Sequence, residues 1–436
     1  MPLEFNELLN LILLWCCGQL LWQRYRGKIK RWMKYNKDRL PRRWLPKSPH
    51  DCLSCCEGIT LKTARINPDV EPYARRKSPR GRRKSVSSQG FACLNPECDY
   101  YGIVDEQIHA LVSHGKRGQQ QDIQYFKCQS CRKAFSSRKG TPLYYLKTST
   151  STVIMVLWLM AEGVDRSVLI RFTGHPDSTI ARWMKRMGQH SQGLHNHYFR
   201  GLTLALIQMD ELYAKVRNKI KASWLWLAID PVSKALPSLH VGSRKASSAY
   251  TLVHDLKLRL AHGCVPAFTT DGLRTYFYAI TAHFGEWYRP HRARTDHWRP
   301  SAELLHGQLI KRKRNRKLTY TLTRMTIGKR SKLFEILQAN GFNSTIQTAF
   351  IERVNLTIRQ GVSLLARRTW STARNEDYLL MHVEWWRAYY HFARPHESLQ
   401  GQTPAMKLGL TDHVWSVDQL LRTPLVPVPA ELSHSP

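Results

Sequence analysis

The stretch Leu202–Glu211, LTLALIQMDE, is the strongest indication of the fold, because it is apolar almost throughout and ends in two acidic residues. Side chains alternate along a β-strand, so even-numbered residues share one face and odd-numbered residues share the other. Both faces are apolar until the end, which is typical of a central strand covered on each side. Asp210 and Glu211 fall on opposite faces, so we expect only Asp210 to point into a site.

The segments that follow predict the rest of a mixed sheet. Residues 223–242 indicate two strands around a turn, in which Asp230 serves the turn and not a metal. Residues 247–263 indicate a crossover helix that ends at Gly263. The run AFTTDG then predicts a strand that delivers Asp271 to its carboxyl end, where ligand sites of α/β sheets tend to lie.

A third acidic residue, Glu352, lies in the predicted helix ERVNLTIR. Glu352, Asn355 and Arg359 recur at helical spacing and share one stripe, on which Asn355 and Arg359 are candidate DNA contacts. A separate apolar stripe can dock on a sheet. That apolar stripe comprises Ile351, Val354, Ile358, Val362 and Leu365.

The charge of the chain indicates the substrate. Lys and Arg number 67 against 32 Asp and Glu, for a formal net charge of +35, which favours a nucleic-acid partner over a small-molecule substrate. Mg²⁺ binds a few convergent carboxylates and keeps waters. Two such ions about 4 Å apart can stabilise the attacking and leaving oxygens of a phosphodiester displacement.

Asp210, Asp271 and Glu352, with the ERVNLTIR helix, resemble the DDE triad of insertion-sequence transposases, which have a ribonuclease-H-like core. The resemblance implies that the three acids hold two Mg²⁺ (or Mn²⁺) ions and that one site cleaves and joins DNA. The interval from Asp271 to Glu352 is longer than in compact integrase-type members and leaves room for an insertion, and the basic run Lys311–Lys317 (KRKRNRK) lies inside it. Glu335 is the alternative third acid, although it lacks the following Asn and Arg.

The ten cysteines occur mostly as close pairs, which suits metal ligation better than a disulfide framework. Cys93-x4-Cys98 and Cys128-x2-Cys131 have the spacing of a Cys₄ zinc ribbon, and they resemble the zinc-ribbon front end of insertion-sequence transposases. The pair Cys52 and Cys55 has two interpretations. It supplies half of a different set of four metal ligands, or it binds a second metal ion incompletely.

Residues 148–190 predict three helices joined by turns that contain Gly, the pattern of a helix-turn-helix. Asp165 and Asp177 are predicted caps of the second and third helices. Arg182, Lys185 and Arg186 on the third helix are candidate DNA contacts. A three-helix packing module without DNA contacts is the alternative.

The ends of the chain carry weaker signals. The apolar run Leu8–Trp22 predicts a packing or oligomerisation helix, with membrane association as the alternative. Residues 73–90 form a basic linker. The segment Trp385–Ala405 resembles the tail that closes many integrase-like catalytic domains. We do not expect His396, which lies in this segment, to act as a catalytic base. The matching tail residues are Arg394, Pro395, His396, Ser398, Leu399, Gly401, Thr403, Pro404 and Ala405.

We therefore expect a multidomain α/β protein that acts as a DNA transposase. Its partners would be double-stranded DNA, at element ends and target, and further copies of itself, with no membrane. It would lie in the cytoplasm on the nucleoid, or in a nucleus. The alternatives are a non-catalytic DNA-binding regulator and a structure-selective nuclease. The expected parts are an N-terminal helical basic segment (1–50), a Cys pair and linker (51–90), a zinc ribbon (91–147), a helix-turn-helix (148–195), a ribonuclease-H-like core (200–410) and a tail (411–436).

Overall fold

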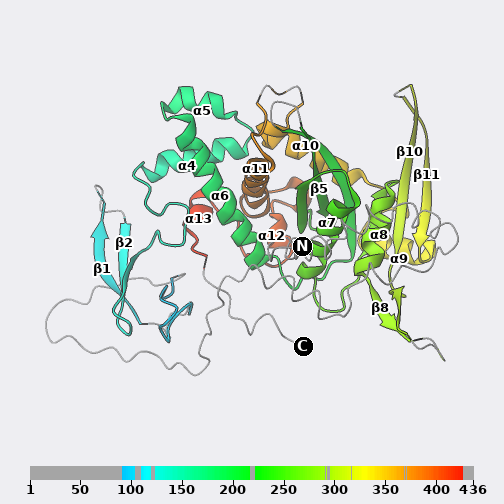
Figure 1. Cartoon of the computed structure of the whole chain (residues 1–436), viewed down its shortest axis with the longest axis horizontal. Coiled ribbons are helices and arrows are strands. Elements are labelled where there is room, and N and C mark those ends of the chain that lie inside the picture. The colour runs from blue at the N-terminus through cyan, green and yellow to red at the C-terminus, as the bar shows by residue number, and fades with distance from the viewer. Residues whose placement is uncertain are drawn as a thin grey trace, which may run out of the picture.

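The computed structural model of the chain describes residues 91–425, apart from gaps at 104–109, 119–122, 217–220, 290, 292–294, 316, 368 and 370. The predicted N-terminal helix, the pair Cys52 and Cys55, the basic linker and residues 426–436 lie outside the described residues. Along the described chain, a small sheet is followed by three helices and then by a large mixed α/β unit (Figure 1). In these described parts, no helix is long and apolar enough to cross a membrane.

A six-stranded mixed sheet forms the centre of the α/β unit, in the order β11-β10-β7-β4-β5-β6. β7 runs parallel to β4 and β10 runs parallel to β7, whereas β5, β6 and β11 each pair antiparallel with a neighbour. This connectivity is consistent with a ribonuclease-H-like core. The strands are β4 (Leu206–Val216), β5 (Lys221–Ile229), β6 (Ser238–Gly242), β7 (Ala267–Asp271), β10 (His306–Arg314) and β11 (Lys317–Ile327).

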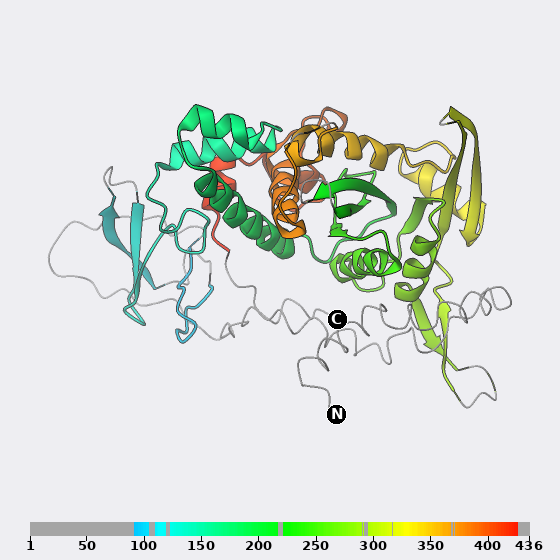
Figure 2. The same cartoon turned by 45° about the horizontal axis from the view of Figure 1, so that its top comes forward.

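Helices cover both faces of this sheet, which explains why β4 is apolar on both sides (Figure 2). Ile207 and Met209 pack in the cluster that includes α7 and α8, whereas Leu212 and Ala214 pack in the cluster that includes α10 and α11. Each fully buried Leu, Ile or Met contributes about 1.5–3 kcal/mol relative to an exposed one. The covering helices are α7 (Ala246–Arg259), α8 (Arg274–His283), α10 (Ala349–Gly361) and α11 (Glu376–Ala388).

β4 is longer than the predicted strand, because it continues past Asp210 to Val216. Leu212, Ala214 and Val216 are buried, an alternation that is visible in the sequence LYAKV. Since β7 ends at Asp271, this second half of β4 pairs with β5 alone among the named strands. Asp210 therefore lies in mid-strand, at the point where the neighbouring strand stops.

The three helices before the α/β unit are α4 (Thr150–Ala161), α5 (Arg166–Thr173) and α6 (Asp177–Tyr198). The predicted cap of α5 is confirmed, since the Asp165 carboxylate accepts a 2.8 Å hydrogen bond from the Ser167 N–H.

The prediction that Asp177 caps α6 is wrong. Pro176 occupies the cap position, and Asp177 is already in the first helical turn. The Asp177 carboxylate instead forms 2.7 Å ion pairs with Arg166 of α5 and with Arg374, just before α11. The start of α6 is thus tied to two other segments.

The predicted boundary near residue 195 is not a break in packing, because α6 runs on to Tyr198 and lies along α11 (Figures 1 and 2). The helices touch at Gly188, where an added Cβ would lie 2.4 Å from the Met381 carbonyl oxygen. Only glycine allows so close an approach. One buried cluster includes residues of α4 and α6 together with residues of the sheet and α11.

The small N-terminal sheet is antiparallel, in the order β1-β2-β3. Its core is formed by Phe126 and Phe135 together with buried cysteines. The strands are β1 (Leu111–Arg117), β2 (Ile123–Cys128) and β3 (Ala134–Ser136).

The long interval between Asp271 and Glu352 holds two helices, α8 and α9, and two hairpins. β8 and β9 pair with each other in a separate two-stranded sheet, and β10 and β11 form the second hairpin. The basic run predicted as an insertion forms the far end of the β10–β11 hairpin. The remaining bounds are β8 (Gly285–Tyr288), β9 (His297–Pro300) and α9 (Arg330–Ala339).

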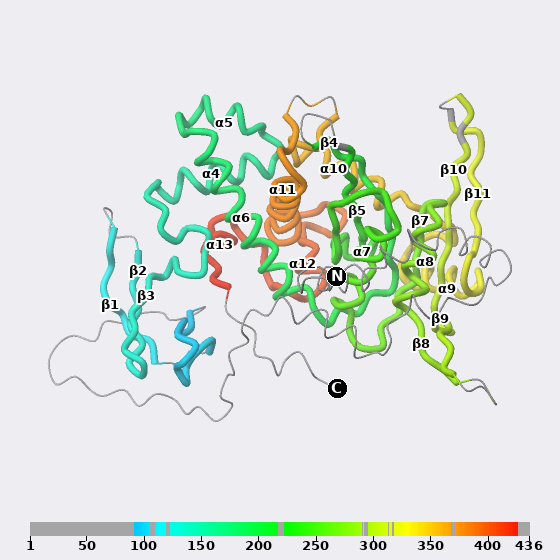
Figure 3. The backbone as a smooth tube through the Cα atoms, viewed as in Figure 1, coloured from blue at the N-terminus to red at the C-terminus, as the bar shows by residue number. Residues whose placement is uncertain are grey.

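The C-terminal segment packs as part of the core. α11 continues into a π-helical turn, and the tail motif leads into α12 (Pro404–Lys407) and α13 (Val417–Arg422). α13 lies beside α6 (Figure 3), where a ring nitrogen of His190 is 3.2 Å from the Leu420 carbonyl oxygen. The expected tail therefore includes a helix, α13, whose Leu420 and Leu421 are buried.

Candidate active site

Two carboxylates meet where β7 ends beside β4. The last pair between these parallel strands joins Met209 to Thr270, so Asp210 and Asp271 are neighbours at the next position. The Leu273 N–H donates a 2.9 Å hydrogen bond to Asp271 Oδ1, which holds this carboxylate at the strand end.

Glu211 joins this cluster, contrary to the expectation from alternation. Carboxylate oxygens of Asp210, Glu211 and Asp271 all lie within 4.8 Å of one another. Glu211 does face the other side of β4, where it accepts hydrogen bonds from Arg244 (2.9 Å) and the Tyr276 hydroxyl (3.1 Å). Because β7 stops at Asp271, no further strand residue separates the two faces there, and the longer Glu side chain reaches the cluster.

Burial and mutual repulsion alter the acidity of these groups. Burial first, and then the charges of Glu211, Asp271 and Glu352, raise the pKa of Asp210 to about 7. Burial also raises the pKa of Asp271 and of Glu211 above their ordinary values. The cluster therefore disfavours three negative charges and has the oxygen donors that a hard divalent cation requires.

Asn355 is buried behind Asp210. Its side-chain amide donates a 2.8 Å hydrogen bond to Asp210 Oδ2. This placement corrects the expectation of a DNA contact, since the amide nitrogen is engaged inside the protein.

Gln208 was missed by sequence reasoning, although it is the one polar residue in the apolar half of β4. It is buried two residues before Asp210 and on the same face. Its side chain accepts a 3.1 Å hydrogen bond from the Ile351 N–H and donates a 2.9 Å hydrogen bond to the Gln347 carbonyl. Gln208 thereby fixes the start of α10 to β4.

Glu352 reaches the same pocket from the first turn of α10. Its carboxylate accepts a 2.7 Å hydrogen bond from Thr348 and forms an ion pair with Lys311 of β10. The three-carboxylate cluster at the end of β7 does not include it.

The pocket that joins these groups has a volume of about 670 Å³. The alternative third acid, Glu335, lies exposed on α9 and does not line it. The lining residues are Asp210, Arg244, Asp271, Gly272, Leu273, Leu309, Ile310, Lys311, Thr348 and Glu352.

Arg359 lies two turns beyond Glu352, about 10 Å along the helix axis. Its guanidinium donates a 3.3 Å hydrogen bond to the Leu365 carbonyl. Burial and the nearby charge of Arg367 lower its pKa. Arg359 is therefore at the far end of α10 and does not line the pocket.

The four predicted zinc ligands come together in the small sheet. The sulfur atoms of Cys93, Cys98, Cys128 and Cys131 lie within 4.8 Å of one another. Cys93 Sγ is 3.6 Å from Cys131 Sγ, and Cys98 Sγ is 3.7 Å from Cys128 Sγ, distances too long for disulfides. Hydrogen bonding to Cys93 is the main effect that lowers the pKa of Cys128, to about 5.

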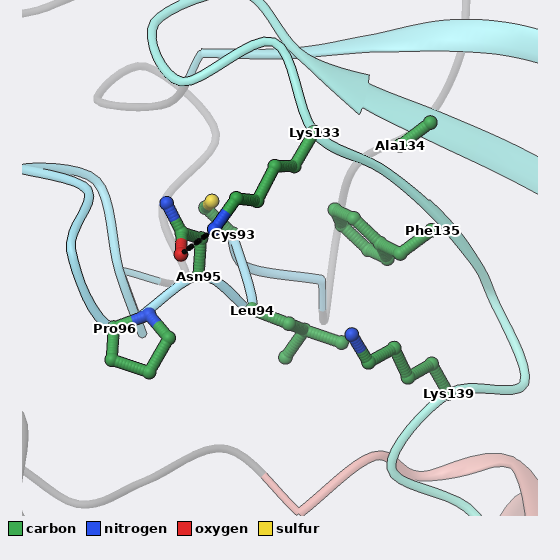
Figure 4. Close-up of a pocket in the computed structure, with 8 residues that line it drawn as sticks. All are labelled: Cys93, Leu94, Asn95, Pro96, Lys133, Ala134, Phe135 and Lys139. Carbon is green, nitrogen blue, oxygen red and sulfur yellow. Dashed lines mark hydrogen bonds between the residues drawn. The ribbon is translucent and has the colours of Figure 1, made fainter.

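A second pocket, of about 220 Å³, lies beside Cys93 (Figure 4). Lys133 crosses it and donates a 2.8 Å hydrogen bond to Asn95 Oδ1, whereas Lys139 lines its other side (Figure 4). This lysine-lined pocket belongs to the outer surface of the cysteine cluster.

On α6, Arg182 and Lys185 are exposed, whereas Trp183 is buried in the core. Arg186 is partly buried, and its guanidinium donates to the Tyr144 carbonyl. Burial and the charge of Arg182 lower the pKa of Arg186. Two of the three candidate DNA contacts on α6 thus face solvent.

Residues 343–404 match the family model of the integrase core domain. This match supports a relation to the DDE transposase and integrase family. The match contains Glu352 and most of the tail motif and begins after Asp210 and Asp271. An integrase core domain indicates a DNA-binding protein with a transposase- or integrase-type function. No curated protein matches this chain in sequence.

Proposed function

We propose that this protein is a DNA transposase that cleaves a DNA strand and joins it to target DNA, with Asp210, Asp271 and Glu352 as its catalytic acids. The observation that carries the proposal is the pocket in which these side chains converge from β4, β7 and α10. The chain's +35 formal charge supports DNA as the substrate. Asp230 supports no such role, since its carboxylate accepts from Ser233 in the hairpin turn.

Two Mg²⁺ or Mn²⁺ ions suit the donor set of this pocket. Asp210 and Asp271 present carboxylate oxygens within 4.8 Å of each other, and a cation would offset the burial and repulsion that raise the Asp210 pKa. Bound ions would stabilise charge on the phosphodiester oxygens and increase the acidity of the attacking hydroxyl. Asp210, Asp271 and Glu352 would hold the ions.

The other polar residues of the pocket would position these acids and the DNA. Asn355 holds Asp210 in place, and Glu211 holds Arg244 at the pocket edge, where the guanidinium can contact a phosphate. Lys311 pairs with Glu352 in the DNA-free protein, and a phosphate would compete for its ammonium group. Arg359 would contact DNA outside the pocket.

The cysteine cluster would bind Zn²⁺ as a zinc ribbon. Four thiolates around Zn²⁺ at 2.3 Å place their sulfur atoms about 3.8 Å apart in a tetrahedron. The two measured separations, 3.6 and 3.7 Å, are close to this value.

Helices α4 to α6 would read the element ends as a helix-turn-helix, with Arg182 and Lys185 in the major groove. Joining two ends requires both to be held together, so we propose a homo-oligomer on DNA. Such a protein would be located with the DNA, on the nucleoid or in a nucleus.

The proposal is tested by measuring cleavage and strand joining, in the presence of Mg²⁺, on DNA that contains the sequences on either side of the gene for this protein. Asp210→Asn and Asp271→Asn should each abolish both reactions and leave DNA binding intact, because affinity rests mainly on Lys and Arg. Glu335→Gln is the matched control and should stay active. Full activity of Asp210→Asn and Asp271→Asn would overturn the proposal.

A further inference from the structure

The far half of the β10–β11 hairpin stands free of the central sheet. β10 pairs with β7 only from His306 to Leu309, and beyond Leu309 it pairs with β11 alone among the described strands. The strand segments Ile310–Arg314 and Lys317–Leu322, which we call the arm, extend past the sheet (Figure 1). At about 3.4 Å per residue, the arm is roughly 17 Å long.

One face of the arm is apolar and exposed. Leu318, Tyr320 and Leu322 are 56%, 56% and 51% exposed. Strand alternation places Tyr320 and Leu322 on the same face, whereas a shift of register between Tyr320 and Leu318 makes Leu318 the partner of Lys313. Across the hairpin, Arg312 is the partner of Tyr320 and Ile310 is the partner of Leu322. Cross-strand partners share a face, so Arg312 lies beside the Tyr320 ring.

The same hairpin is strongly basic. Residues 306–327 contain seven Lys and Arg and no Asp or Glu. Of these, Arg312 and Arg314 are exposed in the arm. A solvent-exposed apolar stripe within such a charge field suits a partner that is both anionic and aromatic.

The arm begins at the wall of the acidic pocket. Ile310 and Lys311, its first two residues, both line the pocket. Ile310 lies on the face that carries Arg312 and Tyr320, whereas Lys311 is on the opposite face and pairs with Glu352. A chain that leaves the pocket along Ile310 therefore meets Tyr320 next.

We propose that the arm binds unpaired nucleotides of the DNA strand that enters the pocket, with Tyr320 as the stacking platform for a base and Arg312 as a phosphate contact. The inference rests on the proposed function, because it takes DNA as the substrate. Aromatic rings beside basic residues are the usual means of holding single strands. In a fully paired duplex the base faces are stacked on one another, so none is available to the Tyr320 ring.

A second copy of the chain is the competing occupant, because β11 is an edge strand with unpaired backbone groups. Charge argues against it. Pairing two such hairpins would bring two sets of seven cations together with no acid from either hairpin. The DNA phosphates supply the missing negative charge.

The experiment compares binding of a forked duplex with that of the fully paired duplex of the same sequence, in EDTA so that no cleavage occurs. We expect the wild type to prefer the fork. Tyr320→Ala should weaken fork binding roughly tenfold and leave duplex binding nearly unchanged. Tyr320→Trp should retain the preference, and Arg312→Gln should weaken both. Leu258→Ala, on the exposed side of α7, and Lys407→Gln are the matched controls.

The outcomes separate the arm from the catalytic proposal. An unchanged fork preference in Tyr320→Ala would overturn the inference about the arm, whatever the protein cleaves. A loss of self-association in Tyr320→Ala, measured by sedimentation without DNA, would also overturn it in favour of a second copy. If the protein prefers the fork through Tyr320 but never cleaves DNA, the result would support nucleotide binding by the arm and contradict only the proposed transposase function.

Discussion

The side-chain amide of Asn355, on α10, donates a 2.8 Å hydrogen bond to Oδ2 of Asp210, on β4. The bond joins a helix to a strand 145 residues away in sequence, next to the anchor that Gln208 makes to the same helix. The helix that carries Glu352 is thus held in register with the strand that carries Asp210. The relative position of the first and third acids depends on these two buried contacts.

Asn355→Ala should slow DNA cleavage by about 10–100-fold while DNA binding stays near the wild-type level. The reason is that Asp210 loses the donor that orients it, and the surface Lys and Arg are untouched. Single-turnover cleavage and binding of the same DNA measure the two effects. Thr357→Ala, on the same helix, is the control. Equal losses of binding and cleavage in Asn355→Ala would show a general structural defect.

The stability of the metal-free protein should depend on pH through Asp210. Its folded-state pKa is about 7 and its ordinary value is 3.8, so the folded state binds this proton more tightly. The stabilisation is complete below pH 3.8 and is lost as pH rises towards 7. In EDTA, Asp210→Asn should therefore gain stability relative to wild type between pH 5 and 7.5, by roughly 2 kcal/mol. Urea unfolding of both proteins at pH 5 and at pH 7.5 measures this gain. A difference in unfolding free energy between the two proteins that is the same at both pH values would contradict the raised pKa of Asp210.

Cys128→Ser should lose one equivalent of zinc per chain. The three remaining thiols cannot complete the tetrahedral site. Cys264→Ser is the control, because Cys264 lies outside the cluster and its thiol donates to the Leu204 carbonyl. Metal analysis of the purified proteins gives the result. Zinc retained in Cys128→Ser, or lost equally in Cys264→Ser, would exclude the four-cysteine site.

Gly188→Ala should destabilise the protein by about 1–3 kcal/mol, although alanine ordinarily favours a helix over glycine. The new Cβ would meet the Met381 backbone, with 2.4 Å to its carbonyl oxygen and 2.6 Å to its Cα. Gly193→Ala is the matched change on α6, since its Cβ would meet only the flexible end of the Leu425 side chain. Thermal unfolding compares them, and equal stability of the two variants would contradict the close crossing of α6 and α11.

Local sequence patterns predicted the strands that carry Asp210 and Asp271 and the helix that carries Glu352, because each depends on periodicity within a few residues. The contacts that complete the pocket were not predictable in this way. Lys311 and Glu352 are 41 residues apart, and no local rule pairs them. The β10–β11 hairpin was read only as a basic insertion, although Leu318, Tyr320 and Leu322 alternate with threonines in LTYTLT.

The alternation of side chains along a strand also led us to exclude Glu211 from the site. Alternation separates two neighbouring residues within a sheet, but it does not do so where the adjacent strand ends. β7 stops at Asp271, beside Asp210, so two adjacent residues of β4 reach one cluster. The end of a strand cannot be located to one residue from sequence alone. Its position, however, decides which carboxylates meet.

In the proposed mechanism Glu352 is the third catalytic acid, and cleavage by Glu352→Gln compared with cleavage by Glu335→Gln tests this role. Both substitutions remove one negative charge from an exposed helical Glu, but only Glu352 lines the pocket with Asp210 and Asp271. With Mg²⁺ and equal DNA binding, we expect no detectable cleavage by Glu352→Gln and wild-type cleavage by Glu335→Gln. Wild-type cleavage by Glu352→Gln would contradict the account.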